Sequence, residues 1–136
     1  MIRSRCLWYF YKTNSRLAMH IEAFRNYCLI KPMVTEEFPF DETTLVFKVC
    51  GKMFALTGLE STDFKVNLKC DPDWAVELRE TYESITAGFH MNKKHWNTVW
   101  VDGSFSDELF RELIDHSYLL VVKGLPKKIR DQINLD

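Results

Sequence analysis

The hydrophobic positions in the first part of the chain predict a helix followed by a β-hairpin. Apolar residues in 20–30 recur three and four positions apart, which is the spacing of one helix face. Pro32 ends this helix, because the residue before a proline avoids the helical region. Residues 44–49 are rich in β-branched and aromatic side chains, and residues 52–56 return as the second strand of a hairpin after a turn at Cys50-Gly51. The expected core face of the helix is Ile21, Phe24 and Cys28.

A strict alternation of apolar and polar residues then predicts a strand over 64–69. Phe64, Val66 and Leu68 should face the core, and Lys65, Asn67 and Lys69 should face outward. The sequence Asp71-Pro72 is a strong helix start, because an acidic side chain caps free N–H groups and proline suits the first turn. This helix is expected to bury Trp74, Leu78 and Tyr82.

The last third of the chain predicts a short strand near Ile85, another strand over 98–101 and a long final helix. Ser106 caps this helix and Gly124 ends it. Pro126 then opens a short basic turn. The expected core face of the helix has three-and-four spacing: Leu109, Phe110, Leu113, Ile114, Ser117, Leu120 and Val121.

These elements follow the order α-β-β-β-α-β-β-α, which predicts a two-layer α+β fold. Short connections and hairpins favour a mainly antiparallel five-stranded sheet with the helices on one face. Residues 19–136 are expected to form this single domain. Met19 directly precedes the first helical pattern, so residues 1–18 are interpreted as an N-terminal extension outside the domain.

The net charge of −1 hides an uneven distribution. Residues 1–18 hold Arg3, Arg5, Lys12 and Arg16 and no acid. From Met19 onward, 14 basic residues face 19 acidic ones, a balance of −5. A domain this acidic does not bind nucleic acid over its whole surface, so DNA contact requires a local basic patch.

Several classes of protein are disfavoured. The densest apolar run, 119–122, is far shorter than the ~20 residues of a membrane span. The four cysteines have no C-x-x-C spacing and are interpreted as reduced thiols of a cytoplasmic protein. We expect no metal or other cofactor, since His90 and His95 lack a third ligand at a familiar spacing. We expect no enzymatic activity, because the sequence has no nucleophile elbow, phosphate loop or paired-carboxylate pattern.

The stretch 88–99 concentrates side chains that bind other molecules. It has no helical or strand periodicity before Asn97, which is typical of a positioned loop or a wing between strands. Its lysines can bind phosphates, its asparagines can hydrogen-bond bases or phosphates, and Trp96 can either stack on a base or pack into the core. The candidate DNA-binding residues here are His90, Asn92, Lys93, Lys94, His95, Trp96 and Asn97.

Two further sets of polar and basic residues extend the candidate interface. One is the outward face of the 64–69 strand, with Lys65, Asn67 and Lys69. The other is the C-terminal turn, with Lys127, Lys128 and Arg130. If the three sets share one face, they form a positive surface on an acidic domain, as expected of a protein that docks on nucleic acid. The sequence leaves this open.

Six segments together resemble the MmcQ/YjbR family. They are 44–49 (TLVFKV), 51–55 (GKMFA), 66–72 (VNLKCDP), 90–99 (HMNKKHWNTV), 113–118 (LIDHSY) and 125–128 (LPKK). The resemblance covers Met19 to Arg130, nearly the whole chain, and 90–99 is its most specific part. Residues 1–18 fall outside it.

The resemblance implies a two-layer α+β fold, with a connectivity similar to that of secretion chaperones, in a bacterial-type protein. It also implies DNA binding through two β-hairpins, a double wing, formed here by the 48–53 hairpin and the 88–98 loop. Lys48, Lys52, Lys93 and Lys94 would contact the DNA backbone, and the role would be regulatory.

A protein-interaction module without a nucleic-acid role is the alternative. The chaperone-like connectivity favours it, and Phe38-Pro39-Phe40 with Trp96 and Trp100 can form an exposed apolar patch. A small-molecule pocket near His90, His95 and Trp96 is a third option. We expect a monomer or a weak homodimer, with DNA or a protein as its partner and no membrane association.

Overall fold

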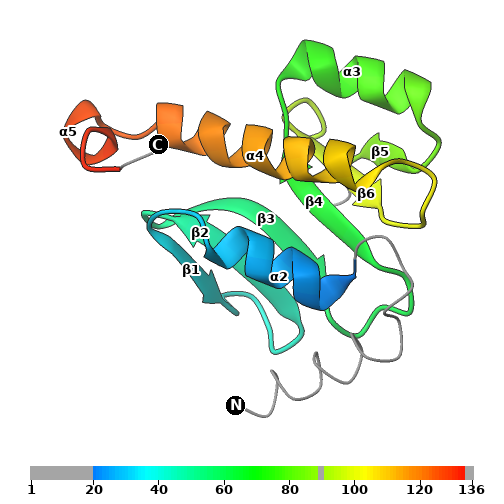
Figure 1. Ribbon diagram of the computed structural model, residues 1–136, viewed down its shortest axis with the longest axis horizontal. Helices are drawn as coiled ribbons and strands as arrows, with labels where there is room; N and C mark the ends of the chain where they lie inside the picture. The colour runs from blue at the N-terminus through cyan, green and yellow to red at the C-terminus, as the bar shows by residue number, and fades with distance from the viewer. Residues whose placement is uncertain (1–19, 89–90, 134–136) are drawn as a thin grey trace.

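The computed structural model describes residues 20–88 and 91–133, and within them six strands form one antiparallel sheet (Figure 1). The order across the sheet is β1-β2-β3-β4-β6-β5. The strands are β1 Val34–Glu37, β2 Thr44–Val49, β3 Lys52–Gly58, β4 Lys65–Lys69, β5 Ile85–Ala87 and β6 Trp96–Trp100. The predicted fold class is confirmed. The predicted count of five strands is wrong, because it lacked β1.

The described helices are α2 Ile21–Leu29, α3 Pro72–Thr81, α4 Asp107–Lys123 and α5 Lys127–Arg130. Figure 1 shows α2 and α4 lying across the same face of the sheet, with α5 beyond the C-terminal end of α4. No helix among the described residues is long and apolar enough to cross a membrane. The proposed extension, residues 1–18, lies outside the described part of the chain.

The helices begin where side-chain caps are available. Asp71 caps α3, since its Oδ2 accepts hydrogen bonds from the backbone N–H groups of Asp73 and Trp74. Ser106 caps α4 by accepting from the N–H of Leu109 at 3.1 Å. Both predicted helix starts are confirmed, and each cap satisfies a backbone donor that the helix itself leaves unpaired.

The main core lies between the helices and one face of the sheet. The ring of Phe24 on α2 packs edge-on against Phe47 at 5.4 Å between centroids and stacks on Phe110 of α4 at 5.9 Å. The predicted inward face of α2 is confirmed, and Val66 and Leu68 of β4 are buried as expected. Burial of these large side chains provides the main driving force for folding.

The core faces of α3 and α4 differ from the prediction in detail. Leu78 is buried, but Trp74 and Tyr82 are only half-buried. On α4, Leu109 and Leu120 are half-buried, while Tyr118 and Val122 join the core. The buried face of α4 is broader than one stripe of three-and-four spacing, because Tyr118 packs on Phe54 and its hydroxyl donates to the carbonyl of Pro32.

The opposite face of the sheet carries a smaller cluster. Val46, Leu56 and Trp96 are buried there, with Met53 and Met91 packed against them. None of the described helices covers this face (Figure 1). The sheet therefore has one closed face, which forms the core, and one open face.

Candidate functional site

The β2–β3 hairpin and the β5–β6 hairpin turn at the same end of the sheet. The β2–β3 turn lies between Val49 and Lys52, which are paired in the register, and Cys50 and Gly51 both have positive φ there. A two-residue turn of this kind matches the twist of the flanking strands. The loop between β5 and β6, residues 88–95, turns at the same end, where the N–H of Cys70 after β4 donates to the carbonyl of His95.

Backbone contacts hold the described part of the β5–β6 loop in place. The carbonyl of Asn92 accepts from the N–H groups of His95 and Trp96, and its side-chain Oδ1 accepts from the N–H of Lys94 at 2.9 Å. Arg79 on α3 donates to the carbonyl of Lys93 at 3.0 Å. The loop is therefore tied to α3, while the side chains of Lys93 and Lys94 are exposed.

Gly88 is required where this loop leaves β5. Its N–H donates to the carbonyl of Trp96 at 2.8 Å, and a Cβ at this position would lie 2.8 Å from the Cβ of Trp96. The two strands approach too closely here for any other residue without a backbone shift.

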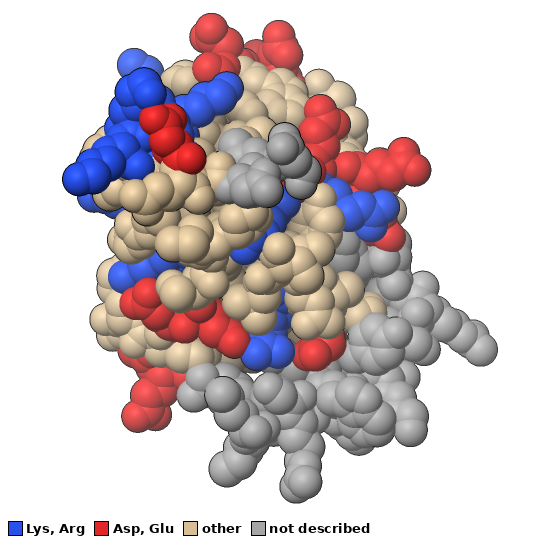
Figure 2. Space-filling view, turned by 60° about the vertical axis from the view of Figure 1, so that its left-hand side comes forward, with Lys and Arg blue, Asp and Glu red and all other residues tan. Residues whose placement is uncertain are grey.

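The C-terminal segment adds more positive charge at this end of the sheet. The helix α4 passes β4 where the N–H of Lys69 donates to Ser117 Oγ, and it continues past the sheet to Lys123 and α5. Figure 2 shows Lys and Arg side chains gathered on this side of the molecule, with acidic side chains among them. The basic end, as we define it, contains Lys52, Lys69, Lys93, Lys94, Lys123, Lys127, Lys128 and Arg130; the acids nearby are Asp71, Asp73 and Asp131.

The loops at the other end of the sheet are acidic. The connections 38–43, 59–64 and 101–106 contain no lysine or arginine. The acids in these loops, in the α3–β5 connection and at the start of α4 are Asp41, Glu42, Glu60, Asp63, Glu83, Asp102, Asp107 and Glu108. The chain is therefore electrically polar along its strands, a feature that its net charge of −1 conceals.

Several lysines of the basic end are free to meet an anion. Among the described residues, the lysines in salt bridges are Lys31, Lys48 and Lys127. Lys52, Lys93, Lys94 and Lys128 are exposed and pair with no described acid. The predicted basic turn is the helix α5, where Lys127 binds Asp131 at 2.6 Å and Arg130 donates to the carbonyl of Lys123.

Two of the predicted contact residues, Trp96 and Asn97, have buried side chains. Trp96 is only 8% exposed and packs with Val46 and Leu56, so its ring has no free face for a base. Asn97 is 2% exposed, and its Oδ1 accepts from Arg79 at 3.3 Å on the helix side of the sheet. Both belong to β6, which begins earlier than the predicted strand at residue 98.

The other predicted residues are distributed over three places. Lys52, Lys93, Lys94, Asn92, His95 and Lys69 lie at the end where the hairpins turn, together with α5. Lys48 is paired with Glu37 at 3.2 Å. Lys65 and Asn67 line the open face of the sheet. His90 lies outside the described residues. The three residues predicted on the outward face of the 64–69 strand are therefore separated: of Lys65, Asn67 and Lys69, only Lys69 lies at the basic end.

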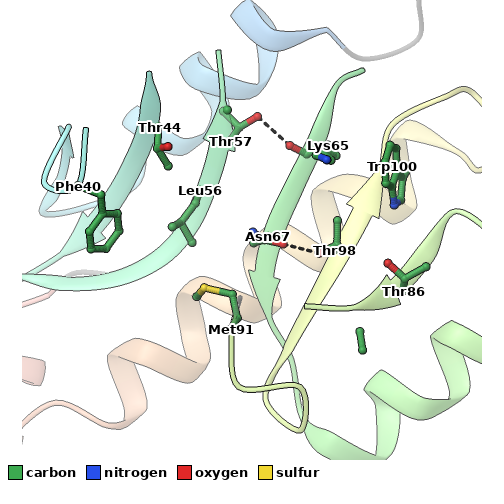
Figure 3. Close-up of a pocket in the computed structure, with 12 residues that line it drawn as sticks. Phe40, Thr44, Leu56, Thr57, Lys65, Asn67, Thr86, Met91, Thr98 and Trp100 are labelled. Carbon is green, nitrogen blue, oxygen red and sulfur yellow. Dashed lines mark hydrogen bonds between the residues drawn. The ribbon is translucent and has the colours of Figure 1, made fainter. Parts of the chain in front are cut away.

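The open face of the sheet forms a groove with a volume of about 670 Å³ (Figure 3). Its floor alternates hydroxyl, amide and apolar side chains from β2 to β5, and Met91 of the β5–β6 loop lies at one edge of it. The lining residues are Phe40, Thr44, Leu56, Thr57, Gly58, Lys65, Asn67, Thr86, Ala87, Met91, Thr98 and Trp100. Sequence reasoning missed most of them, although the alternation Trp96-Thr98-Trp100 was a usable signal for one wall.

Burial favours the neutral forms of several titratable groups in and beside the core. Burial lowers the pKa of His116, and its Nε2 accepts from the N–H of Asp71 at 3.0 Å, so the ring serves as a neutral acceptor. Burial raises the pKa of the Cys70 thiol to about 12 and moves that of Cys28 in the same direction. Within the described residues, no group of three or more His, Cys, Asp or Glu side chains is arranged to hold a metal ion.

Comparison with known sequences identifies relatives over most of the chain. Residues 29–120 match the profile of the YjbR family. A protein of Escherichia coli O157:H7, described as uncharacterized protein YbdF, is 42% identical over 112 residues, which are 82% of this chain and 89% of the relative. Uncharacterized protein YjbR of Escherichia coli strain K12 is 33% identical over 112 residues, 82% of this chain and 95% of the relative.

Solved structures have the same fold. The crystal structure of protein DR2400 from Deinococcus radiodurans, which carries the domain DUF419, superposes with a TM-score of 0.79 at 43% identity, over 85% of this chain and 88% of that one. A crystal structure of a protein from Pseudomonas syringae gives a TM-score of 0.64 at 26% identity, over 75% of this chain and 98% of that one.

Proposed function

The chain belongs to the YjbR family, and we propose that its basic end docks on the phosphate backbone of double-stranded DNA. The observation that carries this proposal is that the β2–β3 and β5–β6 hairpins turn at the same end of the sheet. Both tips carry exposed lysines at the same end of the strands, while the acidic loops lie at the other end. Such a polar molecule orients itself in the field of a polyanion before contact.

The spacing of the hairpins suits a duplex. In the order β1-β2-β3-β4-β6-β5, the centre of the β2–β3 pair lies three strand positions from the centre of the β5–β6 pair. At about 4.8 Å per strand this is about 14 Å, close to the roughly 12 Å width of the major groove of B-DNA. Lys52 on one tip and Lys93 and Lys94 on the other then contact phosphates on both sides of a groove.

The chemistry of this surface favours backbone contact over base reading. Lysine is a point charge that binds phosphate without reading sequence. The side chains in the stretch that are best suited to bases, Trp96 and Asn97, are buried. We therefore expect binding with little preference for sequence and a steep dependence on salt.

The test is fluorescence anisotropy of a labelled random duplex with the full chain at several salt concentrations. The variant Lys93→Ala/Lys94→Ala should bind about tenfold more weakly at low salt. It should also lower the slope of log affinity against log salt by about 1.8, since each phosphate contact contributes about 0.9. Its matched control is Lys65→Ala/Arg111→Ala, which removes the same charge away from the basic end.

The basic residues of 1–18 are present in every variant, so they affect all measurements equally. Equal losses in the two double variants would mean that only net charge matters and would refute the hairpin interface. If the full chain fails to bind at low salt, the proposal is wrong, and the protein-interaction alternative becomes the one to pursue by affinity capture.

A further inference from the structure

The groove on the open face has the dimensions of a small-molecule site. Its volume of about 670 Å³ lies within the range of roughly 300–1,000 Å³ typical of ligand pockets. Its large apolar side chains are Leu56, Met91, Phe40 and the ring of Trp100 (Figure 3). A ligand in it would lie flat on the sheet, since the floor is formed by neighbouring strands.

The described lining of the groove carries positive charge and no negative charge. Lys65 is the charged residue among the described residues that line it, and no acid is among them. The ammonium of Lys65 lies 4.6 Å from the centroid of the Trp100 ring, and Lys65 forms no salt bridge with a described acid. A cation held on an aromatic ring beside an apolar floor is positioned to receive an anion from a bound molecule.

A hydrogen bond between two side chains beside Lys65 fixes which of their polar groups are left to meet a ligand. Thr98 Oγ1 and Asn67 Oδ1 are 2.5 Å apart, so the hydroxyl donates to the amide oxygen (Figure 3). This contact leaves the amide N–H groups of Asn67 as donors toward the groove. Thr86 on β5 is exposed on the same face. The donors therefore lie on the side of Lys65, and the apolar surface lies toward Leu56 and Met91.

From this arrangement we propose that the groove binds a small monocarboxylate with a flat, apolar body. The carboxylate meets Lys65 and the amide of Asn67, and the body lies over Leu56 between Met91 and Trp100. The charge of the groove favours this ligand: its single lysine complements one carboxylate, and its apolar floor complements an uncharged body. An acidic lining, a second cation or a floor without charge would each favour a different ligand. This site is separate from the basic end and does not depend on DNA binding.

The test uses two probes with the same ring system, the anionic 2-naphthoate and the uncharged 2-naphthamide, added to the ¹⁵N-labelled full chain and followed by NMR. Naphthoate should shift the amide signals of Asn67, Thr86 and Thr98 in a saturable manner. Naphthamide should bind about tenfold more weakly, because it lacks the charge-assisted contact with Lys65.

Three variants make the test specific. Lys65→Met keeps the apolar stem over Trp100 and should remove the preference for naphthoate. Thr86→Trp places a large ring in the groove from an exposed position and should block both probes. Lys93→Met, the matched control on the basic end, should leave both affinities unchanged.

Three results would overturn the proposal. One is saturation weaker than about 10 mM for naphthoate. Another is a set of shifts that maps away from Asn67, Thr86 and Thr98. The third is an unchanged preference for naphthoate in Lys65→Met while its thermal midpoint matches that of the parent chain, because the charge would then come from elsewhere.

Discussion

Among the serines of this fold, Ser117 is expected to lower the free energy of unfolding most when its hydroxyl is removed. Ser117 is fully buried on α4, where its Oγ donates to the carbonyl of Phe54 at 2.5 Å and accepts from the N–H of Lys69 at 2.9 Å. The β3–β4 register ends at Ala55 and Leu68, one residue before these two groups. The hydroxyl therefore extends the ladder between the strands and joins both of them to the helix.

The magnitude follows from what Ser117→Ala leaves behind. Two hydrogen bonds are lost, each with a net contribution of about 1 kcal/mol. Because the carbonyl of Phe54 is left without this partner in the core, the cost of its lost bond rises to about 1–3 kcal/mol. We expect the free energy of unfolding to fall by about 2–4 kcal/mol, a large share of the 5–15 kcal/mol typical of a domain.

Two other serines provide matched controls with the same chemical change. Ser106→Ala removes the cap of α4 and should cost about 1 kcal/mol. Ser104→Ala breaks a contact with Ser84 at an exposed position and should cost about 0.5 kcal/mol or less. Urea unfolding followed by circular dichroism ranks the three variants. If Ser117→Ala costs no more than Ser106→Ala, the bridging role of the hydroxyl is refuted.

Two further predictions rest on buried titratable groups. His116 has a folded pKa below its ordinary 6.5, so the unfolded chain gains protons first, and the free energy of unfolding should fall as pH drops from 6.5 through the folded pKa. In His116→Leu the fall measured by urea unfolding should be smaller but not absent, because burial lowers the pKa of His20 in the same direction. Cys28 and Cys70 should resist iodoacetamide at about pH 8 until urea is added, as peptide mass spectrometry would establish, because burial raises both thiol pKa values.

The elements with strong local signals were predictable from the sequence. The caps Asp71 and Ser106 and the alternation over 64–69 each depend on a few neighbouring residues, so they are visible in the chain itself. Strand β1 was missed because Val34–Glu37 has one aliphatic residue and three polar ones. Among the described strands it pairs only with β2, at the edge of the sheet, so its position is set by that partner rather than by its own pattern.

The candidate site was less predictable, because it depends on which side of the sheet each residue faces. The stretch 90–99 reads as one polar loop, yet β6 begins at Trp96 and buries alternate side chains on opposite faces. Asn97 is satisfied by Arg79 and by the carbonyl of Ala75, both from α3, and no spacing in the sequence reveals such a partner. The described residues of this stretch that stay exposed are Asn92, Lys93 and Lys94, just before the strand.

The β5–β6 loop contributes residues to both proposed surfaces, so the choice of variant decides whether an experiment can distinguish the two sites. Met91 turns onto the open face and packs with Leu56, whereas Lys93 and Lys94 project from the basic end only two and three positions later. Deleting the loop would damage both surfaces and distinguish nothing. Changes confined to one side chain do distinguish them, since the lysines have no part in the groove and Lys65 lies at the opposite end of β4 from the hairpin tips. DNA binding that survives Lys65→Met, together with naphthoate binding that survives loss of Lys93, would establish two independent sites on one sheet.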